Sequence, residues 1–299
     1  MIKVVLFISG GILPVLALAT IPTIFYSFMQ GNMEYGLLLI TLALITFLLS
    51  FLIRKFVLPT RQLTTIQGFG AVGLSWIFMS FFGTVPYLLS GIDLSYINIL
   101  FETVSGLTTT GSSILIDINS VDKSLLIWRS TTQWLGGMGV IVLTITVLPL
   151  LGSGGINLFK AESPGPSADR LTPKFKDTAR LLWIVYISLT LIETILLYFS
   201  GLSLYHAFNH SLTTLSTGGF STFNTSVNQF STMSKLIINI FMFLAGTSFI
   251  LLLKTIRSKS LSEFLKSTEF LFYSFMIIAT ASIFLFKTNY VNDNILESI

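Results

Sequence analysis

Gly106-Leu-Thr-Thr-Thr-Gly-Ser-Ser113 lies between two long apolar segments of the chain. A related stretch, Thr214-Leu-Ser-Thr-Gly-Gly-Phe-Ser221, recurs between two further apolar segments. Short Thr- and Gly-rich backbone at membrane depth is tolerated only where protein surrounds it or where it lines a water-filled path. Carbonyl oxygens from such loops can replace the hydration shell of a cation. The two stretches therefore predict a pore that conducts ions across a membrane.

The composition of the chain indicates an all-α polytopic membrane protein. Of its 299 residues, 53% are hydrophobic and only 10% are charged, whereas about 25% are charged in soluble domains. Seven segments have roughly the 20 apolar residues that a membrane-spanning helix needs. They are residues 4–28, 35–53, 69–90, 125–151, 181–200, 236–253 and 270–286. The chain has no cysteine, which excludes disulfides and thiolate metal sites.

The first segment contains Ala17-Leu18-Ala19, which resembles a signal-peptidase site. Apolar sequence continues beyond this triplet, so we interpret the segment as a transmembrane helix. With the amino terminus in the cytoplasm, twelve Lys and Arg residues of the loops fall on the cytoplasmic side. The outer side keeps four, which are Lys123, Arg129, Lys235 and Lys287. Because Lys and Arg in short loops favour the cytoplasm, both Thr/Gly stretches are predicted to face outward.

The chain contains an internal repeat. An offset of 108 residues superposes Gly111 on Gly219, Thr109 on Thr217 and Glu102 on His210. Each unit consists of an outward-directed helix, a short half-helix, a filter-like turn and a second helix. The half-helices, at 95–107 and 203–215, are too short to cross a bilayer. We therefore expect each half-helix to be re-entrant: it enters the membrane, and the turn after it returns the chain to the same side.

These units divide the chain into five parts. Residues 1–67 hold two amino-terminal helices and a linker, 68–152 the first repeat, and 153–179 a cytoplasmic loop. Residues 180–254 hold the second repeat, and 255–299 a cytoplasmic loop and the first helix of a third. Gly219 lies 39 residues after Arg180, and the same count from Glu269 places a third filter glycine near position 308. We therefore expect the chain to be a fragment or a truncated product.

Several stretches resemble the Trk/Ktr/HKT superfamily of potassium transporters, and the TrkH-type subunit most closely. They are residues 101–106, 128–140, 161–166 and 216–221. The resemblance implies four helix–pore loop–helix repeats around a pseudo-fourfold pore, of which this chain holds two complete units and the start of a third. It also implies a multi-pass protein of the bacterial inner membrane, a homodimer, and a cytoplasmic nucleotide-binding regulatory subunit of the TrkA type.

The candidate site is a selectivity filter, and the resemblance implies potassium as the transported substrate. Eight residues are expected to present ion-binding carbonyl oxygens: Thr108, Thr109, Thr110, Gly111, Ser216, Thr217, Gly218 and Gly219. We expect positive φ angles at Gly111 and Gly219. Each half-helix would direct the negative end of its dipole at the filter. We expect no catalytic residue, no bound cofactor and no nucleic-acid partner. Membrane lipid is expected to surround the protein.

Glu102 and Arg129 are candidate supporting residues. Glu102, with Asp93, could raise the cation concentration at the pore mouth, or it could form hydrogen bonds behind the filter. Arg129 could pair with Glu102, pair with Asp122, or extend to the membrane interface. Glu193 lies near the outer end of the fifth span, where water is one of the environments open to it.

Two glycine-rich stretches have simpler explanations. The run of residues 136–139 is expected to allow close helix approach. Residues 68–73 match G-x-G-x-x-G, but no strand precedes them and a membrane span follows, so we reject a dinucleotide site.

The leading functional prediction is potassium uptake as the membrane subunit of a Trk-type system. A sodium-permeable or sodium-coupled transporter of the same superfamily is the alternative, because the filter residues do not decide between the two ions. A polytopic membrane enzyme is a distant alternative, because the few ionisable residues within the spans are scattered along the sequence.

Overall fold

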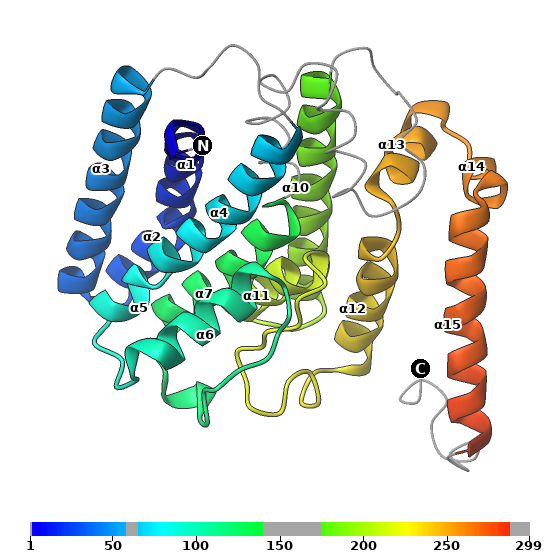
Figure 1. Cartoon of the computed structure of the whole chain (residues 1–299). Coiled ribbons are helices and arrows are strands. Elements are labelled where there is room, and N and C mark those ends of the chain that lie inside the picture. Colours follow the sequence, from blue (N-terminus) through cyan, green and yellow to red (C-terminus); the bar gives the residue numbers. More distant parts are fainter. Residues whose placement is uncertain (1, 58–64, 140–174, 288–299) are drawn as a thin grey trace.

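The computed structural model describes residues 2–57, 65–139 and 175–287, and the regular secondary structure of this part of the chain consists of helices without strands. The predicted fold class is confirmed. The helices are α1 (Ile2–Ala19), α2 (Ile21–Met29), α3 (Met33–Phe56), α4 (Thr65–Gly83), α5 (Val85–Leu89), α6 (Tyr96–Leu107), α7 (Lys123–Gly137), α10 (Phe175–Phe199), α11 (Leu204–Leu215), α12 (Thr232–Ala245), α13 (Phe249–Ser258), α14 (Ser262–Lys266) and α15 (Thr268–Lys287). Figure 1 shows α6, α7 and α11 in the middle of the molecule, with α15 at its edge.

Both predicted half-helices are present and begin at a serine. The Ser95 hydroxyl accepts a hydrogen bond from the N–H of Asn98, and the Ser203 hydroxyl accepts one from the N–H of His206. Serine at this position satisfies an N–H group that the first turn of a helix leaves without a partner. α6 and α11 have 12 residues each, so neither crosses the membrane.

Two of the predicted spans are broken at the same short motif. The segment 4–28 divides into α1 and α2 at Thr20, two residues before Pro22, and the segment 69–90 divides into α4 and α5 at Thr84, two residues before Pro86. Proline has no N–H and disturbs the turn before it. At both breaks the threonine hydroxyl donates to the carbonyl three residues earlier, at 2.7 and 2.6 Å.

The predicted span 236–253 is not one continuous helix, because α12 and α13 meet there at an angle of 96°. Ser248 is extended between them, with ψ at 120°. The Thr247 hydroxyl donates to the carbonyl of Leu244, and the Tyr273 hydroxyl of α15 donates to that of Phe243. The carbonyl groups freed by the bend thus find partners, as backbone at membrane depth requires. Of the predicted span 125–151, α7 covers the first part, and 140–151 lie outside the described residues.

Three described helices are long and apolar enough to cross a membrane, and a fourth crossing results if the bent pair α12–α13 counts as one. These helices cover Gly10–Met29, which includes the break at Thr20, Met33–Phe56 and Arg180–Phe199. Shorter apolar helices cover Gly73–Leu89 and Thr268–Phe284. The apolar side chains on the outside of these helices form a surface suited to lipid.

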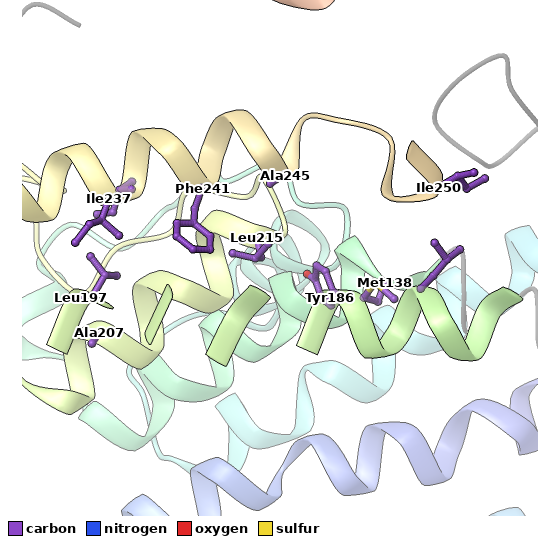
Figure 2. Close-up of a cluster of buried hydrophobic side chains, with 11 residues drawn as sticks. Met138, Tyr186, Leu197, Ala207, Leu215, Ile237, Phe241, Ala245 and Ile250 are labelled. Atoms are coloured by element: carbon purple, nitrogen blue, oxygen red, sulfur yellow. The ribbon is translucent and has the colours of Figure 1, made fainter. Parts of the chain in front are cut away.

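A buried hydrophobic cluster holds α11 against α10 and α12 (Figure 2). Ala207 and Leu215 of α11 pack within this cluster. Tyr186 of α10 stacks on Trp134 of α7 and donates its hydroxyl hydrogen to the Trp134 carbonyl at 3.1 Å. Interiors packed in this way transmit small displacements. The cluster therefore fixes the position of the half-helix on which the second filter stretch depends.

The predicted topology has a direct test, because the chain has no cysteine of its own. A cysteine at Asn228, in the exposed loop after the second filter stretch, is expected to react with a membrane-impermeant thiol reagent in cells with a permeabilised outer membrane. A cysteine at Ser258, exposed at the end of α13, is expected to react only after the inner membrane is opened. The positive-inside distribution is the reason. Labelling of position 258 in cells with a sealed inner membrane would show that the predicted orientation is wrong.

Candidate ion-conducting site

The two half-helices end in the same hydrogen-bonded turn. In the first unit, the N–H of Thr109 donates to the carbonyl of Gly106 at 2.9 Å, and that of Thr110 to the carbonyl of Ser105 at 3.0 Å. In the second, the N–H of Thr217 donates to Thr214 and that of Gly218 to Thr213, both at 2.9 Å. This pattern is a Schellman motif, which requires a left-handed residue just after the helix.

The left-handed residue of each turn is a threonine. Thr109 has φ at 54° and Thr217 has φ at 55°. Such angles are unfavourable for a β-branched residue and persist only where the surrounding structure imposes them. Gly111 and Gly219 follow with φ at 77° and 78°, which confirms the predicted positive angles. The internal repeat is therefore present in backbone conformation as well as in sequence.

The carbonyl oxygens of the eight predicted filter residues are free in the described part of the chain. None of them accepts a hydrogen bond from a described backbone or side-chain donor. The N–H groups of Thr108–Thr110 and Ser216–Gly219, by contrast, donate to carbonyls of the half-helices. Carbonyl oxygens without donors, at the negative end of a helix dipole, are suited to a cation.

The two filter stretches lie against each other. A Cβ atom on Gly111 would collide with the carbonyl oxygen of Gly218, so only glycine permits this approach. On its other side, the second stretch borders a cavity of about 650 Å³. Thr217 and Gly219 line this cavity together with Asn239 of α12 and Tyr273 of α15.

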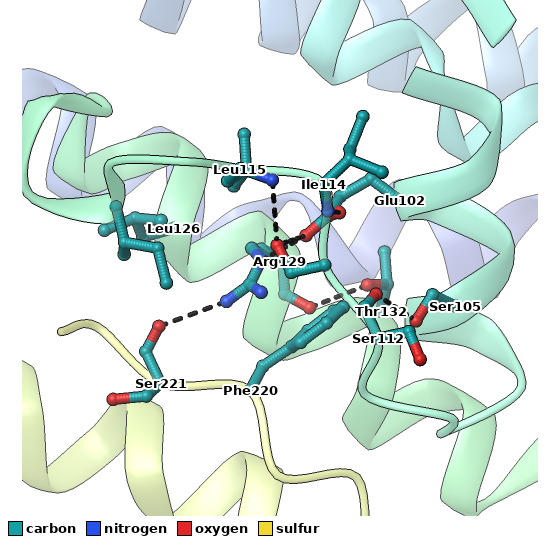
Figure 3. Close-up of polar contacts among 12 residues, drawn as sticks. Glu102, Ser105, Ser112, Ile114, Leu115, Leu126, Arg129, Thr132, Phe220 and Ser221 are labelled. Atoms are coloured by element: carbon teal, nitrogen blue, oxygen red, sulfur yellow. Dashed lines mark hydrogen bonds and ion pairs between the residues drawn. The ribbon is translucent and has the colours of Figure 1, made fainter. Parts of the chain in front are cut away.

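Glu102 and Arg129 form a buried ion pair behind the first filter stretch (Figure 3). Arg129 Nε donates to Glu102 Oε1 at 2.6 Å, and the two side chains are 2% and 0% exposed. Glu102 also accepts hydrogen bonds from the Ser113 hydroxyl at 2.9 Å and from the N–H of Ile114 at 3.0 Å. The carboxylate therefore holds the chain that leaves the first filter stretch.

Arg129 also holds the second filter stretch. Its Nη1 donates to the carbonyl of Ser221 at 3.1 Å, and its guanidinium lies 3.5 Å from the centre of the Phe220 ring. Figure 3 shows Arg129 between the two stretches. Of the predicted alternatives, pairing with Glu102 is confirmed, whereas extension of Arg129 to the interface is wrong. Asp122 instead accepts hydrogen bonds from the first N–H groups of α7.

The expectation that Glu102 attracts cations at the pore mouth is wrong, because the side chain is fully buried. Its repeat partner His210 has the same place in the second unit. His210 Nε2 lies 3.5 Å from the Ser221 hydroxyl and 3.4 Å from the Thr222 hydroxyl. The second unit thus has an imidazole ring where the first has a carboxylate.

Two residues that the sequence did not single out join the repeats. Asn224 accepts a hydrogen bond from the N–H of Ile118 at 2.7 Å and donates one to Asp117 at 2.9 Å, which joins the loops that follow the two filter stretches. Gln133 of α7 accepts a hydrogen bond from the N–H of Phe220 at 3.0 Å. Both contacts join residues about a hundred positions apart, so local sequence carries no signal for either.

The glycine run at the end of α7, residues 136–139, allows close approach, as predicted. A Cβ on Gly136 would collide with the carbonyl of Leu107 at the end of α6, and one on Gly139 would collide with Trp76 of α4. Gly137 lies against Ser216, at the end of α11. The run therefore brings α7 to the carboxyl ends of both half-helices.

The remaining candidates are Glu193 and Asp93. Glu193 is fully buried within α10, which excludes the solvent-exposed alternative for its side chain. Asp93 lines an outer cavity of about 460 Å³ with Asp117 and Asp122. Residues 68–73 lie inside α4 rather than in a strand–helix turn, which supports rejecting the dinucleotide site. The predicted loop stretch 161–166 lies outside the described residues.

Comparisons with known proteins agree with this geometry. The TrkH family model, described as a cation transport protein, matches residues 39–291. The Trk system potassium uptake protein TrkH of Escherichia coli K12 is 36% identical over 212 residues, which are 70% of this chain and 44% of that protein. TrkH of Halomonas elongata is 33% identical over 289 residues, 94% of this chain and 60% of that protein.

The crystal structure of the potassium transporter TrkH from Vibrio parahaemolyticus superposes with a TM-score of 0.81 at 25% identity. The match covers 100% of this chain and 62% of that one. The chain spans about half the length of the curated relatives it matches. The family model matches well over half of the chain, and so the chain belongs to the TrkH family of cation transport proteins, which are integral membrane proteins.

Proposed function

We propose that this chain forms part of the potassium-conducting pore of a Trk-type uptake system. One observation carries the proposal: eight filter carbonyl oxygens are free of hydrogen bonds within the described residues, while their own N–H groups largely serve the half-helices. The names of the relatives, which are potassium uptake proteins, support the choice of ion. The same relatives are transporters, and the enzyme alternative is rejected.

In the proposed mechanism, a potassium ion arriving from outside exchanges water for carbonyl oxygens of similar strength. Thr108–Gly111 and Ser216–Gly219 supply one part of the ring of oxygens, and further repeats of the assembled protein supply the rest. The carboxyl ends of α6 and α11 add a negative potential at the same place. Conduction requires binding strong enough for entry and weak enough for exit.

The finer features of the system belong to the same proposal. We place the protein in the bacterial inner membrane as a homodimer, with a cytoplasmic nucleotide-binding subunit of the TrkA type. The division at residues 68, 153, 180 and 255 into repeats and cytoplasmic loops is likewise proposed. Sodium passage is the second candidate, and the ratio of rubidium to sodium uptake distinguishes the two.

The proposed function is tested by measuring growth at low potassium and the uptake of rubidium and sodium. Expression of the complete gene in a bacterium that lacks potassium uptake is expected to restore growth at low external potassium. Rubidium uptake in the same cells is expected to exceed sodium uptake by at least roughly tenfold, because a carbonyl filter discriminates by ion size or field strength. Equal uptake of the two ions would favour the sodium alternative. Normal membrane insertion without any cation uptake would contradict the proposed function.

A further inference from the structure

Gln133 is a fully buried amide that faces both filter stretches. It lies on α7 one turn after Arg129, and residues four apart share a helix face. Its side chain is 0% exposed. Arg129 reaches the carbonyl of Ser221 and Gln133 reaches the N–H of Phe220, so the two side chains hold consecutive residues of one loop.

The orientation of the Gln133 amide follows from the group that it binds. A backbone N–H can only donate, so the amide oxygen of Gln133 must face Phe220, as it does at 3.0 Å. The NH2 group is thereby turned to the opposite side. Among the described residues, this buried nitrogen has no hydrogen-bond partner.

The space that the Gln133 amide occupies is one that two glycines leave open. A Cβ on Gly218 would collide with the amide carbon, oxygen and nitrogen of Gln133. The same nitrogen lies 3.7 Å from the place of a Cβ on Gly111. The Gly218 carbonyl oxygen lies where a Cβ on Gly111 would be. The Gln133 amide is therefore next to the point where the two filter stretches meet.

Within the described residues the buried NH2 group of Gln133 has no partner, so the contact that holds this side chain is the hydrogen bond that its oxygen accepts from the Phe220 N–H. We propose that Gln133 is a positioning residue of the filter, which sets the separation of Gly218 from Gly111 through the Phe220 N–H. A bulkier or apolar side chain at 133 releases this N–H and lets the second stretch move against the first. Ion preference then falls, because it depends on where the carbonyl oxygens are held.

The proposal rests on the proposed potassium pore, and two measurements separate the two. The variants are Gln133→Met, which removes the acceptor, and Gln133→Glu, which keeps an oxygen for the Phe220 N–H. Gln30→Met is the matched control, because Gln30 also accepts a hydrogen bond from another helix, the Ser124 hydroxyl at 2.9 Å, but far from the filter. All are made in the complete gene and purified in detergent.

In Gln133→Met, the rubidium-to-sodium uptake ratio is expected to fall roughly tenfold, the scale of one lost buried hydrogen bond. Hydrogen exchange across residues 216–222 is expected to accelerate by a similar factor. Gln133→Glu is expected to stay within about threefold of the wild type in both measurements. Gln30→Met is expected to leave both unchanged.

Unchanged exchange at 216–222 in Gln133→Met would overturn the positioning role whatever the transport result. An equal loss of preference in Gln30→Met would also overturn it, because general loosening would then explain the effect. A wild-type protein that takes up no rubidium would contradict the proposed function, and the exchange measurement would still decide the role of Gln133.

Discussion

Arg129→Met is expected to destabilise the protein by about 3–5 kcal/mol, because it leaves the Glu102 carboxylate buried without a counter-charge. The variant also loses the hydrogen bond to the Ser221 carbonyl and the contact with the Phe220 ring. Both filter stretches are therefore released together, and potassium uptake is expected to disappear. Thermal unfolding in detergent and rubidium uptake in cells measure the two effects.

Two further variants distinguish the effect of the unpaired charge from the loss of the contacts by which Arg129 joins the two filter stretches. The double variant Arg129→Met/Glu102→Met is expected to recover much of the lost stability, since removing both partners of a buried pair is often nearly neutral. It is not expected to recover transport, because the N–H of Ile114 and the carbonyl of Ser221 still lack the hydrogen bonds that Glu102 and Arg129 provide. Lys266→Met is the control: its ion pair with Glu263 is exposed and contributes little. A stable, fully active Arg129→Met would contradict the bridging role.

Gly111→Ala is expected to be far more damaging than Gly219→Ala, although the two residues are repeat partners with φ of 77° and 78°. Each substitution costs about 1–2 kcal/mol for an L-residue in the left-handed region. At Gly111 the new methyl group would also meet the carbonyl oxygen of Gly218, whereas no atom lies within 4 Å of the same place at Gly219. The difference between the variants therefore isolates the contact between the two stretches.

The measurement is ion preference together with stability. Gly219→Ala is expected to lower the midpoint of thermal unfolding by a few degrees, as about 1–2 kcal/mol implies for a protein of this size, and to keep a preference for rubidium. Gly111→Ala is expected to lose that preference, because the displaced Gly218 carbonyl belongs to the filter. If the two variants behaved alike, backbone strain alone would explain both, and the close approach at Gly111 would have no functional weight.

Local signals explain what could be predicted from the sequence. Ser95 and Ser203 mark the starts of the half-helices, since a serine hydroxyl caps the first turn, and the predicted limits agree with α6 and α11 to within one residue. The positive φ angles at Gly111 and Gly219 follow from residue type and from the repeat. In each case the physical cause lies within a few positions of the residue.

Two kinds of feature could not be predicted. The first is local: residue type disfavours the left-handed region for threonine, although the turn places Thr109 and Thr217 there. The second is the set of contacts between residues far apart in the sequence. The hydrogen bond from Phe220 to Gln133 spans 87 positions. The bend within the predicted span 236–253 was not foreseen, because hydrophobicity does not reveal a bend whose freed carbonyl accepts a hydrogen bond from Tyr273 of another helix.

The position of Arg129 has a consequence for biosynthesis. Its partner Glu102 precedes it by 27 positions, so the ion pair can form as soon as the first repeat is in the membrane. The Ser221 carbonyl, however, is made 92 residues later. At about 5–20 residues per second, several seconds or more pass in which the guanidinium has only half of its partners. During that interval the first filter stretch is held by Glu102 but lacks its contact with the second stretch. The arrangement of the two stretches therefore forms only after the second repeat has been synthesised.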